Sequence, residues 1–174
     1  MRRIVTGHTP DGKGTIVSDT QVDAGTSPIL SGWEYNYIWW ADEAPTFPDD
    51  GTLHPYSTHF PPVGGFRFLT FTMPPESLER PENLDFEVIL EAIDEMSPGA
   101  ANYMEKDNPG MHTSDTIDFE YIISGEIWLE LDDGKEVHLR AGDTVIQNGT
   151  RHAWHNKGSE PCSVVVCTIG AHRK

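Results

Sequence analysis

The sequence predicts an all-β fold, a sandwich or barrel of short strands covered by one helix. Short apolar segments recur at regular spacing from residue 116 onward, and turn residues separate them, as in sandwiches and barrels. Gly (16) and Pro (13) are abundant, which suits many turns better than long helices. One segment, 86–96, has apolar residues at helical spacing and acidic residues on its other face, so it predicts a covering helix.

The N-terminal half is expected to pack on the barrel. Residues 1–32 are polar and glycine-rich and predict an extended arm. The segment 33–41 is rich in aromatic residues and predicts a strand, and 66–73 predicts another. Between them, residues 42–65 form a proline-rich loop. His54 and His59 of this loop could reach the barrel mouth as a lid, although a surface position is expected.

The C-terminal half predicts six strands, and the turn Asp132-Asp133-Gly134 predicts a hairpin because glycine accepts a positive φ. The strands are expected at residues 116–124, 126–131, 135–140, 144–147, 152–156 and 162–169.

Length favours a single domain with three parts. We expect residues 1–75 to be an arm and strands that pack on the barrel, 76–109 a helical and loop insertion, and 110–174 the core. The strands at 116–124 and 162–169 are apolar on both faces, so each needs cover on both sides. The outer cover could come from the N-terminal strands, from a second subunit, or from both. We expect a homodimer in which sheets or N-terminal arms pack together.

Charge and apolar content exclude several classes of partner. Acidic residues outnumber basic ones 28 to 12, and the net charge of −16 argues against nucleic acid, whose binding draws its affinity from Lys and Arg. There is no run of 18 apolar residues and no apolar leader at the start. Cys162 and Cys167 would face opposite sides of one strand and could not bond each other. We therefore expect a soluble, reduced, cytoplasmic protein without a membrane or nucleic-acid partner.

Several residues of the C-terminal half could bind a metal. Strand alternation places Asp118 and Glu120 on one face, His112 precedes that strand, and His152 lies on a later one. Two imidazoles and one carboxylate form a triad suited to Fe(II), and also usable by Mn or Zn. The alternative is structural, with Asp118 and His152 held only by protein hydrogen bonds.

Two further residues are candidates for catalysis. Glu120 sits one strand step from Asp118, so burial and a like charge should raise its pKa and make it a candidate general acid or base. A Glu120 paired with Arg67 or Arg151 would instead be structural. Gln147 could orient a substrate, or it could join two strands.

Two segments resemble the two signature motifs of the cupin superfamily. Residues 112–125 (HTSDTIDFEYIISG) resemble the first and residues 142–156 (GDTVIQNGTRHAWHN) the second, in the same order and with room for two strands between them. The match is not complete. Ser114 stands at the second histidine of the first motif, and Lys106 stands at its opening glycine. Asp118 replaces the glutamate, and in the second motif Gln147 replaces a proline.

The resemblance implies a double-stranded β-helix, or jelly-roll barrel, in a small single-domain cupin. It implies a metal-dependent enzyme that acts on a small oxygenated organic acid or aromatic, as a dioxygenase or as a decarboxylase or isomerase. His112, Asp118 and His152 would hold a divalent metal, Fe(II) first, with Mn or Zn as alternatives, while Glu120 and Gln147 act in catalysis. The second hypothesis is a small-molecule-binding or sensor cupin without turnover, whose pocket Trp154 or Phe119 would plug.

Overall fold

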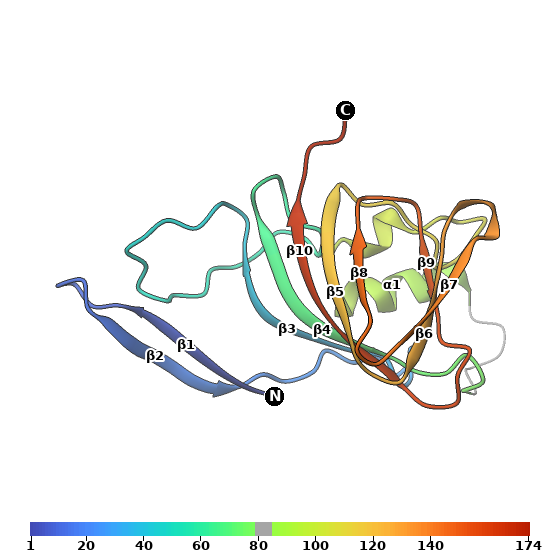
Figure 1. Ribbon diagram of the computed structural model, residues 1–174, viewed down its shortest axis with the longest axis horizontal. Coiled ribbons are helices and arrows are strands. Elements are labelled where there is room, and N and C mark those ends of the chain that lie inside the picture. The colour runs from blue at the N-terminus through green and yellow to red at the C-terminus, as the bar shows by residue number, and fades with distance from the viewer. Residues whose placement is uncertain (79–84) are drawn as a thin grey trace.

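A computed structural model of the chain, which describes residues 1–78 and 85–174, shows two facing β-sheets, a separate hairpin and one α-helix (Figure 1). The elements in chain order are β1 (Arg2–His8), β2 (Gly14–Gln21), β3 (Glu34–Ala41), β4 (Phe66–Met73), α1 (Phe86–Met96), a 3-10 turn (Ala100–Tyr103), β5 (Thr116–Ser124), β6 (Glu126–Glu130), a second 3-10 turn (Asp132–Gly134), β7 (Glu136–Arg140), β8 (Thr144–Gln147), β9 (Ala153–His155) and β10 (Cys162–Gly170).

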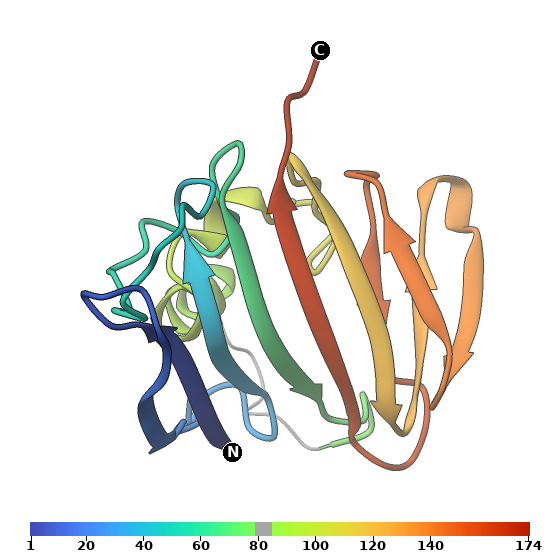
Figure 2. The ribbon, with the colours of Figure 1, turned by 60° about the vertical axis from the view of Figure 1, so that its left-hand side comes forward.

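The two sheets enclose the core. The larger sheet has the order β3-β4-β10-β5-β8 and the smaller one β7-β6-β9, and every strand pair is antiparallel. The sheets face each other without closing into a continuous barrel (Figure 2). The predicted all-β jelly-roll fold is confirmed. Its core side chains come from both sheets and include Leu69, Ile122, Val164, Val166, Ile127 and Leu129.

The predicted strands of the C-terminal half are present, with β5 and β8 at their predicted bounds and the others within two residues of theirs. The β6–β7 hairpin turns where Asp133 and Gly134 adopt positive φ angles of 61° and 65°. Gly125 joins β5 to β6 at φ 77°, and a side chain there would come within 2.5 Å of Pro161 O. Local sequence thus accounts for this half of the fold.

The N-terminal arm is more ordered than the sequence predicts. Residues 2–21 form the hairpin β1–β2, paired from Arg2↔Gln21 to His8↔Gly14 with one register shift. The hairpin lies beside the β3 edge of the larger sheet, where Arg3 donates to Ile38 O at 3.1 Å (Figure 2). Most side chains of both strands are exposed, so the apolar alternation that reveals a half-buried strand is weak here.

Helix α1 contains the apolar residues from which it is predicted and ends before Ser97 as expected, and it covers one end of the space between the sheets. The Asp85 side chain caps it by accepting from Glu87 N, and Ala92 and Met96 are buried against Leu30. None of the helices in residues 1–78 and 85–174 has the length and apolar character needed to cross a membrane.

Candidate functional site

A cavity of about 330 Å³ lies between the larger sheet, the smaller sheet and α1. Its wall is largely aromatic and apolar, with Trp33, Tyr35, Phe60, Phe71, Met96 and Trp154 among the lining side chains. The polar side chains that reach it include His59, His112, Asp118, Glu120, His152 and Thr168. The volume and lining are those of a site for a small, mostly apolar molecule.

His112 and His152 come together on the cavity wall. Their backbones exchange two hydrogen bonds of 2.9 Å, and their ring centroids are 4.2 Å apart. His112 Nδ1 lies 3.1 Å from Gly110 O, and His152 Nδ1 lies 2.9 Å from Thr150 O. A carbonyl only accepts, so each Nδ1 carries the proton and each Nε2 keeps a free lone pair.

Both imidazoles are neutral at pH 7. Burial lowers the pKa of His152 to about 4, with a contribution from the neighbouring His112. Burial also lowers the pKa of His112, against the opposing effects of the Gly110 carbonyl and Glu105. Two neutral imidazoles with free Nε2 atoms can bind a metal or accept a proton.

Asp118 belongs to a polar row that crosses the larger sheet. In register, Arg67, Thr168, Asp118 and Gln147 follow one another on β4, β10, β5 and β8, and all four are buried. Burial raises the pKa of Asp118 to about 6, although the hydroxyls of Thr116 and Thr168 act in the opposite direction. Asp118 Oδ1 has no hydrogen-bond partner in the described part of the chain.

Glu120 lies in the next row, which is apolar. Its neighbours across the sheet are Val166 and Val145, and Leu69 follows on β4. Burial, and then the charge of Asp118, raise the pKa of Glu120 to about 8, so the carboxyl group is protonated at pH 7. Its Oε2 atom finds no partner among the described residues.

The two arginines that could have neutralised Glu120 are engaged elsewhere. Arg67 binds Asp42 and three backbone carbonyls, and Arg151 binds Glu105 and Asp132. The structural alternative of a Glu120–arginine ion pair is therefore absent from this structure.

Gln147 does not belong to the residues that line the cavity in the described structure. Its Nε2 donates to Thr150 O at 3.2 Å, the same carbonyl that receives His152 Nδ1. Gln147 thus contacts the turn that orients His152. It does not line the cavity.

The structure therefore brings four of the five predicted site residues to the cavity and leaves Gln147 outside it. His112, His152, Asp118 and Glu120 share the cavity, and their imidazole and carboxylate donors are of the types that hold divalent metals. The unpartnered oxygens of Asp118 and Glu120 leave acceptors free for an ion. His112, Asp118 and His152 are nevertheless not a preassembled triad, because their ligand atoms do not all lie within 4.8 Å of one another.

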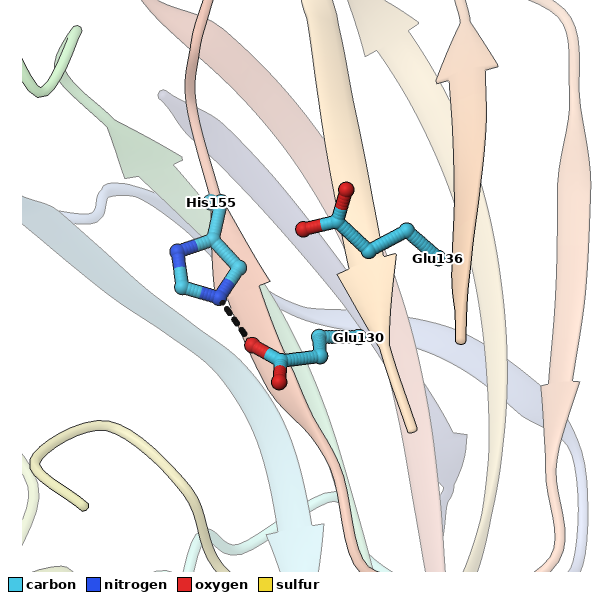
Figure 3. Close-up of side chains that lie close together, drawn as sticks. All are labelled: Glu130, Glu136 and His155. Carbon is cyan, nitrogen blue, oxygen red and sulfur yellow. Dashed lines mark hydrogen bonds and ion pairs between the residues drawn. The ribbon is translucent and has the colours of Figure 1, made fainter. Parts of the chain in front are cut away.

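Among the described residues, the group whose ligand atoms do lie within 4.8 Å of one another is a different one: Glu130, Glu136 and His155, on β6, β7 and β9 (Figure 3). Its members already have partners. His155 contacts Glu130 through Nε2 and Glu76 through Nδ1, both at 2.8 Å, and Glu136 forms an ion pair with Lys157. An ion would have to replace these contacts.

His59 is a cavity residue that the sequence misplaces. His54 is exposed as expected, but His59 is only partly exposed and lines the cavity. Burial lowers the pKa of His59 to about 3, with smaller contributions from His112 and Arg67. The proline-rich segment has no periodicity from which this inward position could be read.

Comparisons with known proteins agree with this architecture. Residues 98–168 match the family model described as a cupin domain. Protein J of the oryzines biosynthesis cluster of Aspergillus oryzae is 36% identical over 66 residues, covering 35% of this chain and 37% of that protein. The cupin-domain-containing oxidoreductase virC of Hypocrea virens is 39% identical over 46 residues, covering 26% and 24%. The matches thus span a little more than a third of the first relative and about a quarter of the second.

The fold has a counterpart among solved structures. The cupin domain of Cnp3 from Schizosaccharomyces pombe superposes with a TM-score of 0.50 at 10% identity, covering 97% of this chain and 87% of that one. At this identity the likeness concerns the fold alone. Residues 98–168 thus match a cupin domain, and the two facing antiparallel sheets have the same fold as the cupin domain of Cnp3.

Proposed function

We propose that the cavity is the active site of a metal-dependent enzyme that acts on a small oxygenated organic acid or aromatic compound. The observation that carries the proposal is the presence, in the lining of one cavity, of two neutral imidazoles with free Nε2 atoms and two buried carboxyl groups with unpartnered oxygens. Buried polar groups left without partners are uncommon in structural sites and typical of functional ones. The name of the virC relative, an oxidoreductase, is consistent with this class.

In this proposal, His112, His152 and Asp118 hold a divalent metal, with Fe(II) the first choice and Mn or Zn the alternatives. Such an ion would act as a Lewis acid on a substrate oxygen. The hydrogen bonds from Nδ1 to Gly110 O and Thr150 O fix the two imidazoles with Nε2 available. Gln147, which shares the Thr150 carbonyl, would position His152 instead of contacting the substrate.

Glu120 would move a proton to or from the substrate. It is held neutral between Val145 and Val166 and lines the cavity, so it can donate a proton or a hydrogen bond to a substrate oxygen. The aromatic wall would hold the apolar part of the substrate and exclude water. Oxygenation, decarboxylation and isomerisation are all compatible with these roles.

The first test is turnover. We expect a screen of keto acids, aromatic acids and neutral aromatic compounds, followed by oxygen uptake and carbon dioxide release in parallel, to find a substrate of the metal-loaded protein. Glu120→Gln should then lower kcat by about 10²–10⁴, the usual value of a positioned general acid or base. Its metal content should stay unchanged. Glu91→Gln, an exposed site on α1, is the matched control and should behave as wild type.

The alternative is a binding or sensor protein without turnover. A binding protein of this kind is expected to have its pocket plugged by Trp154 or Phe119. In the structure, Trp154 lines the cavity without filling it, and Phe119 points outward with 43% of its surface exposed. If several compounds bind in the screen and none is converted, the binding function replaces the enzymatic one. A Glu120→Gln variant as active as wild type would reduce Glu120 to a structural carboxyl group.

We also propose that the protein is a homodimer formed through the outer face of the larger sheet. Large apolar side chains are exposed there, namely Phe68, Phe119, Tyr121, Ile123, Ile146 and Ile169. The outward positions of β5 and β10 carry no charged residue, although the chain has a net charge of −16. Five strands at a spacing of ~4.8 Å make a face of roughly 600 Å², near the ~800 Å² per partner of a stable interface. A second copy offers an equally uncharged surface.

Assembly can be tested by sedimentation velocity at micromolar concentration. Wild type should sediment as a dimer, and Tyr121→Asp should give a monomer because a buried, unpaired charge is costly at an interface. Val137→Asp, at an equally exposed apolar site on β7, should remain a dimer. A monomeric wild type would refute the proposed interface.

A further inference from the structure

His59 is the one polar cavity residue that comes from the proline-rich segment between β3 and β4. Its ring lies edge-on to two other lining residues, with centroids 6.0 Å from Tyr35 and 4.6 Å from Phe60. Phe60 in turn lies 5.9 Å from the ring of His112. His59 and His112 therefore flank the same phenyl group on the cavity wall.

The backbone around His59 is held at several points. His59 N donates to Pro98 O at 2.6 Å, which ties the segment to the end of α1. The carbonyl of Thr58 accepts from Arg67 Nε at 2.9 Å and from Arg67 Nη2 at 2.7 Å. Arg67 is fully buried and also binds Asp42. A buried guanidinium with several bonds keeps this stretch of loop in place, so the ring of His59 has a defined position.

The hydrogen bond between His59 and Tyr37 determines which nitrogen carries the proton. Tyr37 Oη lies 2.6 Å from His59 Nδ1. Burial raises the pKa of Tyr37, so its hydroxyl keeps its proton and needs an acceptor. Ser97 Oγ also lies close enough to affect the pKa of Tyr37, but its geometry is not that of a hydrogen bond, so His59 Nδ1 is the acceptor with the right geometry. His59 therefore carries its proton on Nε2.

The Nε2–H group is the part of the His59 ring that remains free to meet a ligand in the cavity. His59 lines the cavity, and its Nδ1 is occupied by Tyr37, which is not among the lining residues. His112 and His152 have the reverse tautomer, with Nδ1 protonated and Nε2 an acceptor. The cavity thus presents a hydrogen-bond donor on one side and two acceptors on another.

The charge of the cavity limits what that donor can bind. Among the described residues, the lining side chains include neither lysine nor arginine, while they include Asp118 and Glu120. In the metal-free protein, a cavity with carboxyl groups and without a fixed cation disfavours an anion and accepts a neutral oxygen atom. The remaining wall is mostly aromatic, which suits a flat ring.

We propose that His59 is a ligand-recognition residue, and that the cavity selects a neutral, largely apolar ring compound whose carbonyl or hydroxyl oxygen accepts a hydrogen bond from His59 Nε2. This inference rests on one part of the proposed function, namely that the cavity is the substrate site, and it requires neither the metal nor turnover. It narrows the substrate class from organic acids and aromatics to neutral aromatic compounds with an oxygen acceptor.

The test uses metal-free protein and three probes: acetophenone, ethylbenzene and benzoate. Acetophenone and ethylbenzene have similar shapes and differ in the carbonyl oxygen, while benzoate adds a charge. Wild type should bind acetophenone roughly 5- to 10-fold more tightly than ethylbenzene, the value of one neutral hydrogen bond, and should bind benzoate weakest. His59→Phe should remove the preference for acetophenone. His54→Phe, an exposed histidine of the same segment, should keep it.

A second measurement can be made on the wild-type protein, so its main result does not require the His59 variant to fold. Imidazole nitrogen NMR shifts of wild type should show His59 protonated on Nε2, and Tyr37→Phe should convert it to a mixture of tautomers. Ser97→Ala should leave the tautomer unchanged. The proposal is overturned if wild-type His59 is protonated on Nδ1, if neither neutral probe binds, or if His59→Phe keeps the selectivity. Failure to find metal or turnover would refute the proposed enzyme but would leave these results intact.

Discussion

Alanine at His112 or at His152 is expected to abolish the binding of about one divalent ion per chain, a loss of more than about 100-fold in affinity. Each variant removes one of two converging Nε2 ligands, and changes even to the supporting residues of metal sites cost about 10- to 100-fold. Asp118→Asn should weaken binding as well, because an amide is a poorer ligand for a hard cation than a carboxylate. Elemental analysis and calorimetric titration with Fe(II), Mn(II) and Zn(II) provide the measurements.

The matched control is His155→Ala, which removes the histidine of the Glu130–Glu136–His155 group. Since its ring already joins Glu76 to Glu130, we expect this variant to keep the metal and to lose only those contacts. The opposite pattern, with metal lost in His155→Ala and kept in His112→Ala, would move the metal site to the β6-β7-β9 sheet. No metal in the wild-type protein, by analysis and by titration, would end the metal proposal altogether.

Glu120→Gln is expected to stabilise the metal-free protein at alkaline pH and to leave its stability near pH 5 almost unchanged. The pKa of Glu120 rises from an ordinary value of 4.5 to about 8 in the folded state. Below pH 4.5, the carboxyl group is protonated in both folded and unfolded chains and contributes no pH dependence. Between pH 4.5 and pH 8, only the unfolded chain loses the proton, so the free energy of unfolding falls as pH rises.

The size of this effect is large for one residue. A pKa rise from 4.5 to about 8 corresponds to roughly 5 kcal/mol of lost stability above pH 8, and a buried glutamine amide offsets part of the gain from removing the charge. We expect Glu120→Gln to exceed wild type by roughly 2–5 kcal/mol at pH 8.5 in urea unfolding with a chelator present. Glu91→Gln, at an exposed position, should follow the wild-type curve. Parallel curves for Glu120→Gln and wild type would mean that Glu120 is not desolvated.

Local sequence was sufficient for the strands of the C-terminal half and for helix α1. A strand alternates its side chains with a period of two, so the inward direction of Asp118 and Glu120 follows from the segment that contains them. The helix bounds follow in the same way from the spacing of its apolar residues. The two buried carboxyl groups of the candidate site could thus be identified without a structure.

Other features depended on residues far apart in the chain, and the tertiary structure alone decided them. The proline-rich segment has no periodicity, so the inward position of His59 follows only from the hydrogen bonds of Thr58 O with Arg67 and of His59 N with Pro98 O. Gln147 faces inward as alternation requires, but the path of the chain through Thr150 determines that it supports His152. The sequence also did not determine the ion pairs. Partners such as Arg67 and Asp42 meet only when distant strands and loops pack together. Alternation assigns a side chain to a face, and long-range packing determines what it meets there.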